Sequence, residues 1–116
     1  MGALYRPGMT FEEHVRRALD GLPDHIAAAL RNVAVVVEEE NAEEPDLYGL
    51  FDGVPLPERG DEAGLLPNRI AVYRRPLLED FPDPDELEHE IRVTVLHELG
   101  HYFGLDEDRL AELGYE

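Results

Sequence analysis

Residues 93–104 of this chain read Val93-Thr94-Val95-Leu96-His97-Glu98-Leu99-Gly100-His101-Tyr102-Phe103-Gly104. Within this stretch His97 and His101 are four residues apart, so on a helix they share one face, one turn above each other. That spacing lets both imidazoles reach one zinc ion at about 2.0–2.1 Å. Glu98 lies beside them and can accept a proton from a water on that metal. The stretch therefore predicts a helix that carries a catalytic zinc site.

The residues around the motif indicate where this helix begins and ends. Asp83 is suited to the N-cap and Pro84 to the first helical position. An apolar residue then recurs at every fourth position: Leu87, Ile91, Val95, Leu99 and Phe103. The two histidines lie on a different stripe, so we expect the metal beside the packed face. Gly104 can adopt the left-handed conformation that ends a helix and turns the following residues back toward the histidines.

A third ligand is needed just after this chain reversal. Because the chain contains no cysteine, a zinc site must be built from histidine and carboxylate. Asp106, Glu107 and Asp108 stand at the required place, but they also have a structural role to fill. Asp106 is suited to be the N-cap of a last short helix, with a hydrophobic staple between Leu105 and Leu110. The role of helix cap and the role of metal ligand therefore compete for the same carboxylates.

The pattern H-E-x-x-H-x-x-G-x-x-E, from His97 to Glu107, resembles the extended motif of the metzincins and aspzincins. The chain's small size and C-terminal half are similar to the minimal zincin-like metallopeptidases found as single bacterial domains. This resemblance implies that Glu107 is the third ligand, where aspartate or histidine is usual, with Asp106 and Asp108 as alternatives. It also implies a zincin fold, in which the substrate pairs with a sheet edge beside the active-site helix. The methionine turn of metzincins is not expected, because both methionines precede residue 10.

The residues before the motif predict two helices and three strands. A capping box at 10–13 starts the first helix, and a second helix is expected over 24–31. The expected strands cover residues 33–37, 46–53 and 68–74. The first of them is a continuous apolar run, which predicts burial on both faces. An acidic solvated loop is expected over 38–45, a long surface loop over 54–67, and one helical turn within 76–81.

Helices and strands are segregated along the chain, so the predicted fold class is α+β. We expect a zincin-like fold with a small mixed or antiparallel sheet of about three strands, packed against the active-site helix and N-terminal helices. The length of 116 residues fits one domain. Residues 10–116 are expected to form it, after a disordered lead-in at 1–9. The strand at 47–52 is our candidate for the substrate-binding edge, where Gly49 would let another backbone approach.

The net charge of -17 argues against nucleic acid or an anionic membrane as a partner. Such a charge could favour basic peptides or simply keep the protein soluble, and we prefer the second interpretation. No segment is long enough to span a membrane, and residues 1–9 lack the architecture of a signal peptide. The absence of cysteine is compatible with the cytoplasm, where we expect the protein. The expected partner is a peptide or protein substrate, and the expected assembly is a monomer or homodimer. His14, His25 and His89 are expected at the surface.

These features predict a zinc-dependent metallopeptidase. Zn2+ would be held by His97, His101 and Glu107, with Glu98 as the general base. Candidate donors for the developing oxyanion are Tyr102, Tyr115, Arg69, Arg74 and Arg75. The alternative is a zincin-fold binding or interaction module with weak or no catalysis. A peptide deformylase is excluded because that class requires a metal-binding cysteine.

Overall fold

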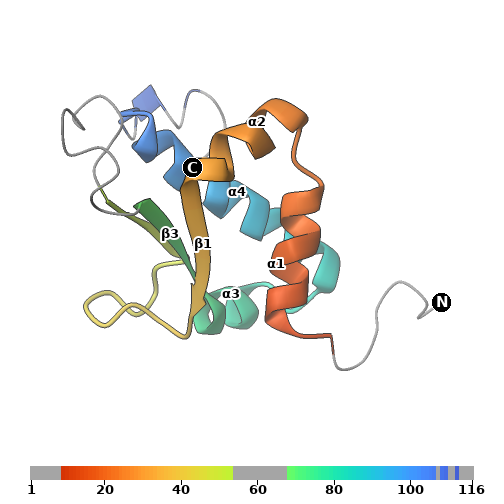
Figure 1. Cartoon of the computed structure of the whole chain (residues 1–116). Coiled ribbons are helices and arrows are strands. Elements are labelled where there is room, and N and C mark those ends of the chain that lie inside the picture. The colour runs from red at the N-terminus through yellow and green to blue at the C-terminus, as the bar shows by residue number, and fades with distance from the viewer. Residues whose placement is uncertain (1–8, 54–67, 107, 110–111, 113–116) are drawn as a thin grey trace.

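The computed structural model describes residues 9–53, 68–106, 108, 109 and 112. They form four α-helices, a short 3-10 helix and a three-stranded sheet (Figure 1). The elements are α1 (Phe11–Asp20), α2 (Asp24–Ala29), η1 (Leu30–Asn32), β1 (Val33–Glu38), β2 (Gly49–Asp52), β3 (Asn68–Tyr73), α3 (Arg74–Asp80) and α4 (Pro84–Tyr102). The predicted α+β class, with a small mixed sheet packed against the motif helix and an N-terminal helix, is confirmed.

Strand β3 lies at the centre of the sheet, because the strand order is β1-β3-β2. β1 runs parallel to β3, and β2 runs antiparallel to it. Ile70 and Val72 of the central strand are 0% exposed. The prediction that the first strand is buried on both faces is wrong, since Val33 is buried but Ala34 is exposed. Because β1 is an edge strand, its valine run reflects the preference of β-branched residues for strands and not burial on two faces.

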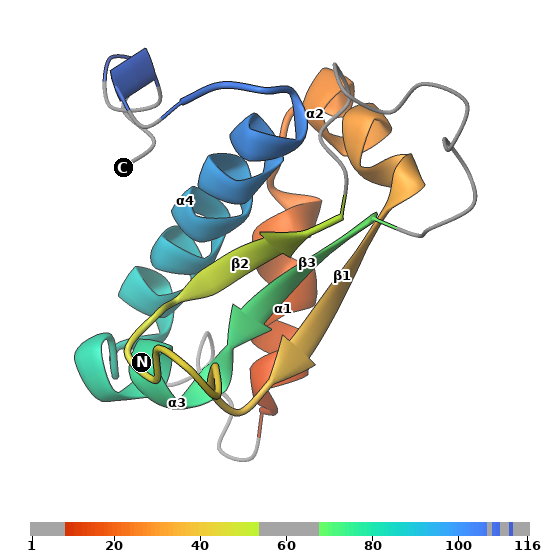
Figure 2. The same cartoon turned by 90° about the vertical axis from the view of Figure 1, so that its left-hand side faces the viewer.

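Helices α1 and α4 lie side by side against one face of the sheet (Figures 1 and 2). The core is built from Phe11, Val15, Ala18, Val33, Ile70, Val72, Leu77, Leu87, Ile91, Val95, Leu99 and Tyr102. The prediction that Phe103 belongs to the apolar face of α4 is wrong, because Phe103 is 41% exposed whereas Tyr102 is 4% exposed. A step of four residues turns about 40° beyond a full helical turn, so a residue at every fourth position drifts off the packed face. Tyr102, seven residues after Val95, remains on that face.

The termini of α4 are those that the sequence predicts. The Asp83 side chain caps the helix by accepting a backbone N–H of the first turn at 3.0 Å. Gly104 has φ +83°, in the left-handed region. The N–H of Leu105 donates to the carbonyl of Gly100 at 3.0 Å, and that of Gly104 donates to the carbonyl of His101 at 2.9 Å. This bond pair is the Schellman motif, which reverses the chain directly after the two histidines.

Other elements differ from their predicted bounds at the ends. The second helix ends at Ala29 and tightens into the 3-10 helix η1. The strand predicted over 46–53 is shortened to β2, because the Leu47 N–H closes a turn onto the carbonyl of Glu44 at 3.1 Å. The helical turn predicted within 76–81 belongs to the seven-residue helix α3.

The acidic loop after β1 is mostly exposed, as predicted, but it is tied to α3. Arg75 donates its Nε to Glu40 at 2.6 Å and its backbone N–H to the carbonyl of Glu39 at 3.0 Å. Its Nη2 donates to the carbonyl of Pro45. The Asn41 side chain accepts two backbone N–H groups of the same loop, at 2.9 and 2.8 Å. These hydrogen bonds hold the loop that connects β1 to β2 in one conformation.

The prediction that His14 lies at the surface is wrong, whereas His25 and His89 are exposed as predicted. His14 is 5% exposed, and its Nδ1 lies 2.7 Å from the Oε2 of Glu88 in α4. Arg17 donates its Nε to the same oxygen at 3.0 Å. The three side chains join α1 to α4 at a buried ionic contact. His14 shares the apolar face of α1, and that position was the signal for its burial.

Several predictions fall on residues outside the described ranges. They concern the lead-in up to residue 8, the loop at 54–67, Glu107 and Tyr115. The single domain over 10–116 stays a prediction for the same reason. No helix in the described part of the chain is long and apolar enough to cross a membrane.

Candidate metal centre

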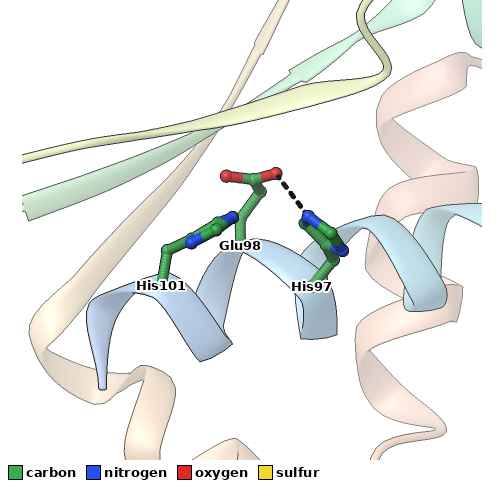
Figure 3. Close-up of side chains that lie close together, drawn as sticks. All are labelled: His97, Glu98 and His101. Carbon is green, nitrogen blue, oxygen red and sulfur yellow. Dashed lines mark ion pairs between the residues drawn. The ribbon is translucent and has the colours of Figure 1, made fainter. Parts of the chain in front are cut away.

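One group of side chains among the described residues could hold a metal ion, and it consists of His97, Glu98 and His101. Each offers one ligand atom, and these atoms lie within 4.8 Å of one another. The three side chains project from α4 toward the sheet, with Glu98 between the two imidazoles (Figure 3). The predicted spacing on one helix therefore brings both rings and the carboxylate together.

The arrangement of the two rings fits a shared zinc ion. Their centroids are 5.0 Å apart and their planes meet at 74°. Two imidazole nitrogens bound tetrahedrally to one zinc at about 2.0–2.1 Å place their ring centroids about 5 Å apart. Imidazole nitrogens are also ligands that catalytic zinc uses. The residues present therefore fit the metal that the sequence predicts.

Glu98 is held between the strand β2 and His97. Its side chain is nearly buried, at 11% exposed. Oε1 accepts the backbone N–H of Phe51 at 2.8 Å, and Oε2 lies 3.9 Å from Nε2 of His97. One carboxylate oxygen is thus fixed by the strand, and the other faces the candidate metal position.

Beside Glu98, some backbone N–H and C=O groups of the edge strand β2 point away from the sheet. Tyr73 donates its N–H to the carbonyl of Tyr48 at 2.8 Å, which makes these two residues a hydrogen-bonded pair. In an antiparallel ladder the alternate residues, here Gly49 and Phe51, direct their N–H and C=O groups to the outer side. The Phe51 N–H that reaches Glu98 is one of these outward groups. The predicted edge strand is therefore confirmed as an edge, and it adjoins the metal centre.

A groove runs along this edge and carries two pockets. The pocket on the amino-terminal side of α4 has a volume of about 210 Å³ and is lined by Leu47, Tyr48, Gly49, Glu90, Val93, Thr94, His97 and Glu98. The pocket next to it is lined by Glu44, Leu47, Gly49, Leu50, Phe51, His97, Glu98 and His101. Both contain His97 and Glu98, so the metal centre lies within the groove.

Gly49 serves the packing of α4 against β2. A Cβ at this position would lie 2.5 Å from Cγ2 of Thr94 and 2.9 Å from the carbonyl oxygen of Ala71. We predicted that Gly49 would admit another backbone, but the close neighbour here is the helix that carries the metal centre. Gly49 thereby sets how closely β2 approaches Glu98.

We expect Gly49→Ala to lower the free energy of unfolding by about 1–3 kcal/mol, because overpacking forces the helix and strand apart. Combining it with Thr94→Ser, which removes Cγ2, should recover part of that loss. Urea denaturation of the single and double variants measures both effects. Equal stability of Gly49→Ala and the parent protein would show that the strand and helix can separate at no cost.

The acidic residues predicted after α4 do not belong to the metal group, as far as the structure describes them. Asp106 accepts the backbone N–H of Arg109 at 2.9 Å, so the predicted capping role is confirmed. Asp108 is exposed, and neither aspartate belongs to the metal group found among the described residues. Glu107 and Tyr115 lie outside the described ranges.

The candidate oxyanion donors are engaged elsewhere, as far as the structure describes them. Arg69 pairs with Asp52, Arg74 with Glu39, and Arg75 with Glu40. None of the three arginines lines the two pockets. Tyr102 is buried, with its ring centroid 5.7 Å from that of Phe51.

Sequence reasoning gave no groove role to Glu90 and Thr94 of α4, and it placed Tyr48 in the candidate edge strand without a role of its own. Glu90 and Thr94 share the helical stripe of His97, and this spacing was the available signal. Tyr48 donates its hydroxyl to Asp80, and this bond is the main cause that raises the pKa of Tyr48 to about 12. The Tyr48 side chain therefore stays neutral at physiological pH and serves as a wall of the groove.

A family model described as zincin-like metallopeptidase matches residues 30–115, which is most of the chain. The matched segment begins just before β1 and includes the whole of α4 and the metal centre. No curated protein matches the chain.

Proposed function

The chain belongs to the zincin-like metallopeptidase family, and from that premise we propose that it hydrolyses peptide bonds in the groove between β2 and α4. The observation that carries this proposal is the position of Glu98. One of its oxygens accepts the Phe51 N–H at 2.8 Å while the other faces His97 at 3.9 Å. A nearly buried carboxylate held in this way beside two imidazoles is placed to act as a general base.

His97 and His101 would hold the metal, with Glu107 as the third ligand. The capping bond that the Arg109 N–H donates to Asp106 supports this choice, because it commits the Asp106 carboxylate to the chain after α4. Three protein ligands with one position open distinguish catalytic zinc from structural zinc. Bound there, the ion would supply Lewis-acid polarisation of the scissile carbonyl and a lowered pKa for water.

The chain's own residues would do the rest of the chemistry. Glu98 would accept the proton of the attacking water and pass it to the leaving amine. The Phe51 N–H keeps the carboxylate in one orientation, so little reorganisation is needed when the proton moves. An extended substrate would pair with the outward N–H and C=O groups of Gly49, since the outward N–H of Phe51 is already bound to Glu98, and so lie across the metal centre.

The experiment uses protein purified without chelator, assayed on broad peptide pools. We expect zinc to copurify, a chelator to abolish cleavage, and added zinc to restore it. Cleavage that persists after complete removal of zinc would contradict the proposal. Bound zinc with no cleavage of any pool would favour the alternative, a binding module that keeps the zincin fold.

A further inference from the structure

The pocket on the His97 side of the groove has apolar walls and two carboxylates, those of Glu90 and Glu98. Leu47 and Gly49 line it from the β2 side, and Val93 lines it from α4. Glu90 is the acid in this lining that lies away from the metal centre. A site of this composition suits a side chain that has an aliphatic stem and a charged end.

Glu90 lies at a defined distance from the metal centre. It precedes His97 by seven residues on the same helical stripe, which is about 10 Å along the axis of α4. A substrate residue bound near His97 could therefore reach Glu90 only with a long side chain. Lysine and arginine combine such a length with a positive charge.

The charge of Glu90 is uncompensated within the part of the chain that the structure describes. No arginine or histidine there forms an ion pair with it, although its side chain is partly buried. The nearby Tyr48 has its pKa raised first by its bond to Asp80, then by burial, and further by the negative charges of Asp80, Glu90 and Asp46. Arg75 already pairs with Glu40, Asp46 and Glu79. This end of the groove is therefore negative and would favour a cation.

We propose that this pocket receives an arginine or lysine side chain of the substrate, whose cation pairs with Glu90. The inference rests on the proposed peptidase function, because it assigns the substrate class of that same groove. A cation there would neutralise a partly buried carboxylate, while the apolar walls would cover the aliphatic stem. Glu90 would then determine specificity and take no part in the chemistry.

The test measures binding of fluorescent peptides to zinc-loaded Glu98→Gln protein, in which the peptides should stay intact. Alanine-rich peptides carry arginine, norleucine or glutamate at one position, which is scanned along the peptide. At the peptide position whose side chain enters this pocket, we expect the arginine peptide to bind about five- to twentyfold more tightly than the norleucine peptide. Adding Glu90→Gln should remove this preference, and adding Glu90→Arg should transfer it to the glutamate peptide.

The matched control is Glu86→Gln, which removes the same charge from an exposed residue of the same helix and should leave the preference for arginine unchanged. The inference is overturned if Glu90→Gln keeps the preference, or if no position shows one. Hydrolysis by the parent protein is measured separately. A preference for arginine that depends on Glu90, without any hydrolysis, would support the proposed pocket and reject the peptidase function. Hydrolysis without this preference would support the peptidase function and reject the proposed pocket.

Discussion

Glu98→Gln is expected to bind zinc as the parent protein does and to lose about 10²–10⁴-fold in peptide hydrolysis, the range that general base catalysis contributes. Glutamine keeps the shape of the side chain and an oxygen that can accept the Phe51 N–H. It cannot take a proton from the attacking water. The variant should therefore remain folded and hold its metal while the chemical step fails. Zinc content and kcat/KM on a cleaved peptide are the two measurements.

The control for Glu98→Gln is Glu86→Gln, since it makes the same substitution at an exposed position of α4. It should keep both zinc and activity. Hydrolysis by Glu98→Gln at the rate of the control would refute the role of Glu98. Loss of zinc in Glu98→Gln would instead show that this carboxylate acts as a ligand.

The second large effect is expected from the two histidines. His97→Ala and His101→Ala each remove one of two imidazoles whose centroids are 5.0 Å apart. Loss of an outer hydrogen-bonding partner of a ligand costs about 10–100-fold in metal affinity, so loss of a ligand itself should cost more. We expect the zinc content of both variants to fall close to zero, with hydrolysis lost in parallel.

His89→Ala is the matched control, because His89 is an exposed histidine of the same helix. It should retain the zinc of the parent protein. If His97→Ala and His101→Ala also retain it, the metal lies elsewhere. Zinc content measured by mass spectrometry after dialysis distinguishes these results.

The features that the sequence predicted well are those with local causes. The bounds of α4 follow from Asp83 at its N-cap and Gly104 just after its end, and both act through neighbouring backbone groups. The pairing of His97 with His101 follows from the period of one helix. A single segment of sequence was enough for each of these predictions.

What the sequence could not predict depends on contacts between distant segments. The bond from Phe51 to Glu98 joins residues 47 positions apart, and no local pattern of either segment encodes it. The same holds for the contact between Nδ1 of His14 and the carboxylate of Glu88, 74 positions apart. The burial of β1 was overestimated because an apolar run does not tell an edge strand from a central one. Order within the sheet is a property of the whole fold.

The central claim is that the two imidazoles of α4 and a carboxylate bind one zinc ion. X-ray absorption spectroscopy of the zinc-loaded protein tests this claim most directly. We predict two imidazole nitrogens at about 2.0–2.1 Å, with oxygen ligands completing a four-coordinate shell. His101→Ala should remove one imidazole from that spectrum. A zinc shell made of oxygen alone, with no imidazole scattering in the parent protein, would contradict the account.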